Sequence, residues 1–574
     1  MAFAARTHFN VATSGHATNF GGGFDPTNAG FLTDLAATGA TGTAPVVTSA
    51  SYNFDDTDVD HWIFIQAGTN WRAGWYKIVS VDAGAATLNA TAEAYSLYPI
   101  GVSAYDGCAT VASPTGGTWA IDYSRSTPPL QFTDLAIDAT TNTDISSAIH
   151  TLGKQMLGNI IPITSGTGFT VQRIQLTSYV SAGVLRADKA VGTVGSTGGT
   201  GYLGGALASP GGAAALAVAE SATQCHISVW AGTYSLTSTS AGAAGRVTLP
   251  TNTSNTALCG IRGCNTVPGD QDGTRPTMQG GVAGSNNYMI TMSGSLSFVE
   301  NLVLDGNNGT YAAWRGVAGV SGQAGYIYNV KFTSMNGNAF APGAGYSHLS
   351  SCEFTGIGST AVMDIGSRIV NLDNCYFHAN SGHSIQLSNG FGKVTAWNLL
   401  FANNTGRDIY NSAADGAGLT LANCTFYGNS SHAIQFNATS SGNYQNPTHL
   451  FNCLFSEVMG TAFSLNAAQA NVVLRTCAFY SCGSKYDSTK LWRSYDEIAL
   501  TADPFTAKGS NDFTLNSISG GGAELVAGGY PQAMPGLSSV ANYPRVGAYS
   551  PDGTVSDSST IFGHAGYLGS RTLG

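Results

Sequence analysis

The chain has 574 residues, of which 10% are charged, 43% are hydrophobic and 74 are glycine, and its net charge is −10. So little charge with so much glycine excludes a coiled coil, a long helical bundle and a disordered tail, and indicates an all-β protein with many turns. The acidic balance disfavours a nucleic-acid partner, because such surfaces need clustered lysine and arginine. No apolar run reaches 18 residues, and the start lacks the apolar core of a signal peptide. We therefore expect no membrane insertion and synthesis in the cytoplasm without standard export.

Four regions follow one another along the chain. Residues 1–190 show no repeat and hold short alternating segments between turns, which predicts one or two small β domains used for attachment or assembly. Residues 191–215 are mostly Gly, Ala, Ser and Thr, which predicts a hinge. Residues 216–550 contain the repeat described next, with a capping segment before it, and residues 551–574 form a C-terminal tail.

A repeat built on Asn-x-x-Phe organises the third region. Its eight copies begin at Asn301, Asn329, Ser351, Asn374, Asn398, Asn423, Asn452 and Thr476. The 175 residues between the first and the eighth start make seven steps, an average of 25. Six copies carry an apolar residue 11 positions after the start. The chain between these two positions therefore has a constant length, and insertions fall in the rest of the copy. Short β segments at this period predict a parallel β-helix.

Two columns of this repeat have alternative interpretations. The position after the start holds cysteine in five copies, and we expect these thiols to be small buried hydrophobic groups rather than a metal or redox ladder. Six residues after the start, three copies carry Asn380, Asn404 and Asn429. We expect a ladder of amide hydrogen bonds there rather than a binding site.

Several segments resemble known β-helical families. The stretch 225–234, ending Ala-Gly-Thr-Tyr after an Ala-rich helix, resembles the cap and first turn of pectate-lyase-like right-handed β-helices. The stretch 377–380, Phe-His-Ala-Asn, and its equivalents are similar to the FxxN repeats of polymorphic outer-membrane proteins. The stretch 503–505, Asp-Pro-Phe, resembles the closing turns of such helices. The resemblance covers residues 207–550 and implies a right-handed parallel β-helix.

The layout also resembles bacteriophage tail spikes, tail fibres and other virion proteins. That resemblance implies a virion structural protein, a homotrimer, which contacts other virion proteins through its N-terminal region and attaches to host-surface glycans. The alternatives are a polysaccharide-degrading enzyme, either a depolymerase or a lyase, and a purely structural self-assembling scaffold.

The acidic residues of the repeat disfavour catalysis. Glycoside hydrolysis needs two carboxylates about 5–10 Å apart. The acids between residues 321 and 480 occupy six different positions of the repeat: Glu353, Asp364, Asp373, Asp408, Asp415 and Glu457. We therefore assign no catalytic residue and expect no metal or cofactor, and we favour a protein that is not an enzyme.

A binding surface is the alternative that we prefer for the repeat. The residue 12 positions after the start should face outward, because its neighbours face inward. In three successive turns this position holds Gln386, Tyr410 and Gln435, which predicts an outward-facing stripe. The residues three positions earlier in the same turns are His383, Arg407 and His432. Amides and a phenol can bond and stack against sugars, so these six residues are the candidates for glycan or receptor contact. An ordinary solvated face remains the other interpretation.

Overall fold

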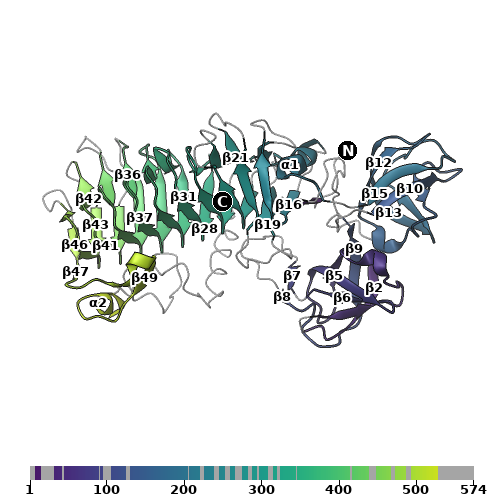
Figure 1. The fold of residues 1–574 in the computed structure, drawn as a ribbon, viewed down its shortest axis with the longest axis horizontal. Helices are drawn as coiled ribbons and strands as arrows, with labels where there is room; N and C mark the ends of the chain where they lie inside the picture. The colour runs from purple at the N-terminus through teal and green to yellow at the C-terminus, as the bar shows by residue number, and fades with distance from the viewer. Residues whose placement is uncertain are drawn as a thin grey trace, which may run out of the picture. The chain divides into compact units, whose positions relative to one another are not determined.

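The computed structural model describes residues 7–13, 31–41, 44–89, 91–94, 105–123, 130–203, 206–219, 225–237, 245–251, 259–264, 275–281, 287–293, 296–307, 314–319, 324–343, 345–413, 417–437, 448–466, 472–486 and 493–527. Almost all of its regular structure is β, as predicted (Figure 1). The chain divides into two compact units, residues 1–282 with 289–303, and residues 283–288 with 304–574. Among the described residues, no helix is long and apolar enough to cross a membrane.

The first unit contains two small β bodies. An eight-stranded sheet runs in the order β4-β9-β2-β3-β6-β5-β7-β8. Its strands are β2 (Leu32–Thr38), β3 (Val46–Thr48), β4 (Trp62–Ala67), β5 (Gly74–Asp82), β6 (Ala85–Leu88), β7 (Thr91–Ala94), β8 (Tyr105–Asp106) and β9 (Gly117–Asp122). A closed barrel follows, made of β10 (Leu130–Ile137), β11 (Asp144–Ser146), β14 (Val184–Ala187), β13 (Gln172–Ser181), β12 (Ile160–Ser165) and β15 (Gly199–Leu203). Trp119 of the sheet and Phe132 of the barrel belong to one hydrophobic cluster, whereas Trp62, Phe64 and Trp75 of the sheet form a second one.

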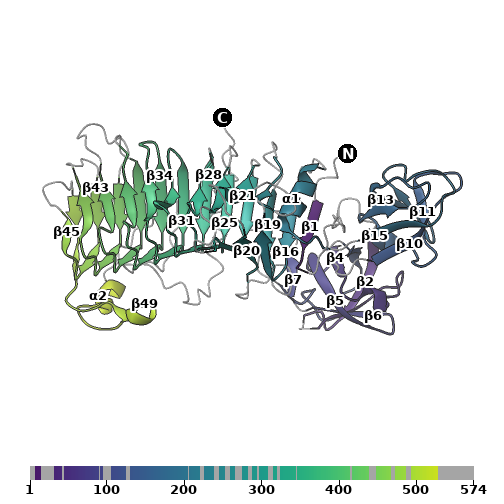
Figure 2. The ribbon, with the colours of Figure 1, turned by 45° about the horizontal axis from the view of Figure 1, so that its top comes forward.

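Three parallel sheets make up the repeat region, and each turn of the chain contributes one strand to each sheet (Figure 2). The first sheet contains β1 (Thr7–Val11), β16 (Cys225–Val229), β19 (Cys259–Gly263), β22 (Leu296–Glu300), β25 (Ala324–Tyr328), β28 (Tyr346–Ser350), β31 (Ile369–Asp373), β34 (Lys393–Trp397), β37 (Gly418–Ala422), β40 (Thr448–Phe451), β43 (Val472–Arg475) and β46 (Arg493–Tyr495). The second contains β17 (Thr233–Leu236), β20 (Thr277–Gly280), β23 (Val303–Asp305), β26 (Lys331–Thr333), β29 (Glu353–Thr355), β32 (Tyr376–His378), β35 (Leu400–Ala402), β38 (Thr425–Tyr427), β41 (Leu454–Ser456), β44 (Ala478–Tyr480) and β47 (Ile498–Ala499). The third contains β18 (Val247–Thr248), β21 (Tyr288–Met292), β24 (Arg315–Gly319), β27 (Phe340–Ala341), β30 (Ala361–Asp364), β33 (His383–Leu387), β36 (Ile409–Asn411), β39 (Ile434–Phe436), β42 (Thr461–Leu465) and β45 (Ser484–Tyr486).

Left-handed residues fix the two corners around each short strand of the second sheet. The first residue of all eight copies has a positive φ of 51–57°, and six of these eight residues are asparagine. Asparagine tolerates this conformation better than most residues, which explains why it marks the start of the repeat. Five residues later a second column of positive φ follows, for example Ala379, Asn403 and Gly428.

The interior of the repeat consists of stacked identical positions. Phenylalanine rings from successive turns lie nearly parallel, and the centroids of Phe377 and Phe401 are 5.0 Å apart. The five cysteines of the repeat column are buried and free, which confirms that they are apolar core groups. The asparagine ladder is also confirmed, because Asn404 Oδ1 accepts from the Asn380 backbone N–H at 3.0 Å, and Asn404 Nδ2 donates to the Phe377 carbonyl at 3.1 Å.

A C-terminal segment covers the outer face of the second sheet within the second unit. It contains the hairpin β48 (Phe505–Ala507) and β49 (Asp512–Leu515), followed by helix α2 (Gly522–Ala527). Phe505 and Phe513 pack with outward residues of that sheet, such as Leu400. Lys508 forms ion pairs with Glu457 and Asp503. This segment therefore shields apolar residues that the sheet would otherwise expose to water.

Two parts of the sequence lie differently from expectation. Strand β1 pairs in parallel with β16, so residues 7–11 belong to the first sheet of the repeat region and not to a separate N-terminal domain. Residues 191–215 contain β15 and the first part of helix α1 (Pro210–Ala219). Residues 7–11 lie more than 200 residues before β16, and residues 191–215 are poor in large side chains, so composition does not reveal the strand pairing of either stretch. Residues 551–574 lie outside the described residues.

Candidate functional site

The predicted stripe lies on the third sheet. Strands β33, β36 and β39 pair in register, which places Gln386, Tyr410 and Gln435 in one column. His383 and Tyr410 have ring centroids 4.4 Å apart, although they come from different columns of the repeat. The two predicted columns therefore meet on one face, which we call the polar face: His383, Gln386, Arg407, Tyr410, His432 and Gln435.

Three side chains form the centre of the polar face. Tyr410 is half-buried, and its ring contacts both His383 and Arg407, whose guanidinium carbon is 4.7 Å from the ring centroid. The Tyr410 hydroxyl accepts a hydrogen bond from Asn437 Nδ2 at 3.0 Å, so its own proton remains able to donate. We call His383, Arg407 and Tyr410 the central cluster.

The protonation state of His383 follows from its contacts. Its Nδ1 accepts the Arg407 backbone N–H at 3.3 Å, which leaves the proton of the neutral ring on Nε2. Burial, together with the positive charge of Arg407, lowers the pKa of His383 to about 4. At neutral pH the central cluster therefore contains one neutral imidazole and one guanidinium.

Asp408 lies directly behind the central cluster, inside the helix. Its side chain is fully buried, and Oδ1 accepts from Asn404 Nδ2 at 2.8 Å. Burial raises the pKa of Asp408 to about 8, so the carboxyl group is largely protonated at neutral pH. It does not neutralise the adjacent Arg407. Sequence reasoning treated Asp408 only as a scattered acid, because no spacing reveals that a residue points inward at a bend.

The register of the copy beginning at Ser351 corrects one alignment. Met363 pairs with Ile385, and Asp364 pairs with Gln386, one residue later than the constant offset predicts. One additional residue precedes the third-sheet strand in this copy. Asp364 therefore joins the outward column, where it accepts hydrogen bonds from Ser388 Oγ at 2.6 Å and from the Gly366 backbone N–H at 3.2 Å.

The outer members of the polar face differ in accessibility. Gln386 and His432 are half-buried, and His432 Nδ1 accepts the Thr461 backbone N–H at 3.1 Å. Gln435 is only 8% exposed, which differs from the outward side chain that alternation predicts. Its column neighbour is the larger Tyr410, and neighbouring strands lie only about 4.8 Å apart, so a bulky ring leaves little room beside it.

The acids of the repeat lie on different sheets. Glu353, on the second sheet, pairs with Lys331 Nζ at 2.9 Å and with His378 Nε2 at 3.0 Å. Asp373 ends a strand of the first sheet, and burial raises its pKa to about 7. Asp364 lies on the third sheet and Asp408 inside the helix, whereas Asp415 is outside the described residues. Within the described parts of the chain, no group of three or more His, Cys, Asp or Glu could hold a metal ion.

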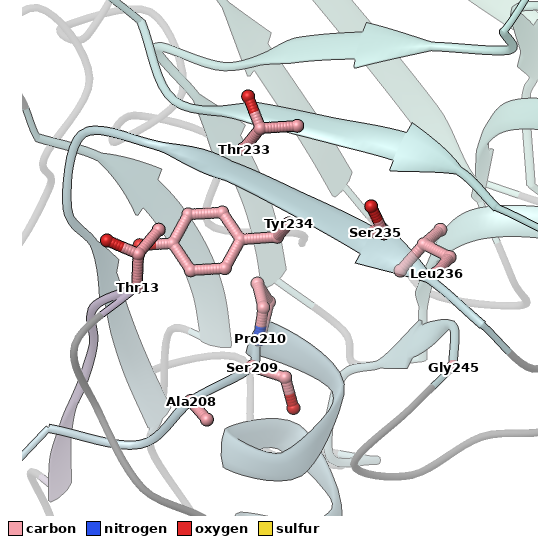
Figure 3. Close-up of a pocket in the computed structure, with 9 residues that line it drawn as sticks. All are labelled: Thr13, Ala208, Ser209, Pro210, Thr233, Tyr234, Ser235, Leu236 and Gly245. Carbon is pink, nitrogen blue, oxygen red and sulfur yellow. The ribbon is translucent and has the colours of Figure 1, made fainter.

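A small cavity lies elsewhere, in the first unit (Figure 3). It encloses about 170 Å³ beside the start of helix α1 and is lined by hydroxyl-bearing residues such as Thr13, Ser209 and Ser235. Ligand pockets usually hold about 300 Å³ or more. The hydroxyl of Tyr234, which also lines the cavity, donates to the Trp230 carbonyl at 2.7 Å, so it holds backbone in place. We therefore take the cavity as packing space and the polar face as the candidate site.

Comparison with known proteins agrees with this architecture. Residues 339–501 match the family described as the right handed beta helix region. The repeat is a right-handed parallel β-helix. No curated protein matches the chain.

Three solved structures are similar to the chain in fold. They are the A-module of the Azotobacter vinelandii mannuronan C-5 epimerase AlgE6 (12% identity, 48% of this chain and 84% of that chain, TM-score 0.34), the pectate lyase Pel9A (12%, 57% and 88%, 0.33) and the catalytic domain of a GH87 α-1,3-glucanase in complex with nigerose (9%, 81% and 88%, 0.31). At these identities and TM-scores the similarity concerns the fold and says nothing about the activity of this β-helix.

Proposed function

We propose that the β-helix binds glycans through the polar face of its third sheet. The observation that carries the proposal is the half-buried ring of Tyr410, which contacts both His383 and Arg407. An aromatic ring offers an apolar surface to a sugar, and the adjacent imidazole, guanidinium and phenol offer hydrogen-bond donors. Gln386 on the neighbouring strand extends this surface along the helix axis.

Screening the full chain on a glycan array tests the proposal. Tyr410→Ala should weaken binding roughly ten- to a hundredfold, because it removes a ring worth about 1.5–3 kcal/mol when fully covered. Tyr495→Ala is the matched control, since Tyr495 is a 40% exposed tyrosine of the first sheet. Equal loss in both variants, or no bound glycan at all, would refute glycan binding by the polar face.

We further propose that this binding serves host attachment by a bacteriophage virion protein of the spike or fibre type. The support is the order of the parts, two small β bodies followed by a β-helix, which is similar to that of such proteins. A trimer, with the N-terminal region contacting other virion proteins, belongs to the same proposal. Light scattering after size exclusion tests the trimer, and a monomer at micromolar concentration would contradict it.

The polysaccharide-degrading alternative makes a different prediction. Incubation with the glycan that binds best should release neither reducing ends nor unsaturated uronate, because the described acids of the repeat are scattered over the three sheets and the interior, and Glu353 and Glu457 are held in ion pairs with lysines. Product formation would favour the enzyme and would place catalysis outside the polar face.

A further inference from the structure

We propose that the polar face contains a subsite for an anionic group on the glycan, a carboxylate or a sulfate, held by Arg407 beside the ring of Tyr410. The inference rests on the proposed glycan binding and names the chemical class of the ligand. It starts from the environment of Arg407, whose guanidinium lies 4.7 Å from the Tyr410 centroid. The ring contact orients the planar guanidinium and leaves its hydrogen-bond donors for another partner.

Within the described part of the chain, no carboxylate pairs with Arg407. The Arg407 Nε atom is buried and has no hydrogen-bond partner there. Lys331 and Lys508, by contrast, each form an ion pair with a glutamate. A partly buried guanidinium without a counter-charge favours an anion that supplies one.

The neighbours Asp408 and His383 do not neutralise the positive charge of Arg407. The adjacent Asp408 points inward, is fully buried and bonds Asn404, so it does not reach the outer face. His383, which also contacts the Tyr410 ring, is neutral at neutral pH and presents Nε2–H as a donor. The central cluster thus carries one positive charge and additional neutral donors, a combination that suits a single carboxylate or sulfate.

A set of three polymers with one backbone tests the inference. Dextran, carboxymethyl dextran and dextran sulfate are each cross-linked into the matrix of a native gel, so that binding to the immobile polymer slows the full chain and its mobility gives the affinity. The wild type should be retarded by the charged polymers and not by dextran, although its net charge of −10 opposes polyanion binding. The stronger of the two charged polymers identifies carboxylate or sulfate as the preferred group.

Variants then locate the subsite. Arg407→Gln should weaken binding of the preferred polymer roughly ten- to a hundredfold, because it removes one charge-assisted contact. Arg407→Lys keeps the charge and should weaken binding less. Lys393→Gln, at an exposed position of the first sheet, removes the same charge and should leave binding unchanged. Circular dichroism of each variant verifies folding.

Three results would overturn the subsite: equal retardation by all three polymers, no retardation by either charged polymer, or equal losses from Arg407→Gln and Lys393→Gln. These results are distinguishable from failure of the proposed function. If the glycan array shows Tyr410-dependent binding of neutral glycans only, glycan binding stands and the anionic subsite is wrong.

Discussion

Replacement of Asp408 by asparagine should remove a pH-dependent cost from the stability of the β-helix. Asp408 is fully buried, and its pKa rises from 3.8 to about 8 in the folded chain. Between these two values the folded state binds more protons than the unfolded state, so stability falls as pH rises. The slope is about 1.4 kcal/mol per pH unit, and the integral over about four units is about 5 kcal/mol. Asparagine has the shape of the protonated carboxyl group and does not ionise.

Urea unfolding followed by circular dichroism between pH 5 and pH 9 measures this effect. The free energy of unfolding of Asp408→Asn minus that of the wild type should grow by several kcal/mol over this range, because all other titrating groups cancel in the difference. Glu353→Gln is the control. The ion pairs of Glu353 with Lys331 and His378 lower its pKa to about 2. The ionised Glu353 therefore stabilises the folded chain above the pKa of the unfolded state, and this stabilisation is lost only in acid. The Glu353→Gln difference should stay constant between pH 7 and pH 9.

A pH-independent difference for Asp408→Asn would refute the reasoning. It would mean that the Asp408 carboxyl group ionises without penalty, and therefore that water or a cation reaches the interior at this bend. Arg407 would then have an ionised carboxylate as its neighbour in the chain.

Four further outcomes follow from the interior of the repeat. Phe401→Ala, within the column of stacked rings, should lower the free energy of unfolding by about 3–5 kcal/mol in urea titration, whereas loss below 1 kcal/mol would contradict tight stacking. Asn404→Ala should cost about 1–3 kcal/mol in the same assay, because it leaves the Asn380 backbone N–H without its acceptor. Asn398→Gly should be nearly neutral and Asn398→Val should cost at least about 1 kcal/mol, since φ there is 57°; equal effects would argue against the left-handed turn. In a thiol titration of the native protein, at most Cys482 of the ten cysteines should react quickly, and rapid reaction of several thiols would show that the column is open.

The sequence predicts the repeat well because its signals are stacked side chains. The apolar column containing Phe401 and the amide ladder containing Asn404 both follow from a constant spacing, and both are present. Spacing does not predict backbone conformation, so the left-handed φ shared by the starting residues appears only in the structure. It explains in retrospect why asparagine marks the repeat.

The spacing of residues in the sequence predicts only part of the candidate site. Its residues were found from the outward column, but the contact between His383 and Tyr410 depends on a bend that brings two columns together. The place of Asp364 in the column depends on one additional residue, which a fixed offset cannot detect. Glycan contact by these residues stays a prediction.

The corner between the first and second sheets has a constant length, whereas the corner between the third and first sheets varies in length, and this difference decides where the chain can accept new sequence. In the eight copies of the repeat, two residues separate each first-sheet strand from the next second-sheet strand, as Asn398 and Leu399 do between β34 and β35. In the same copies, the number of residues between a third-sheet strand and the next first-sheet strand ranges from four, between Asp364 and Ile369, to eleven, between Phe436 and Thr448. New sequence inserted at that corner leaves the ring stack and the amide ladder intact. Because each such corner directly follows a strand of the third sheet, length and sequence can change next to the strands that carry the polar face while the fold of the β-helix is kept.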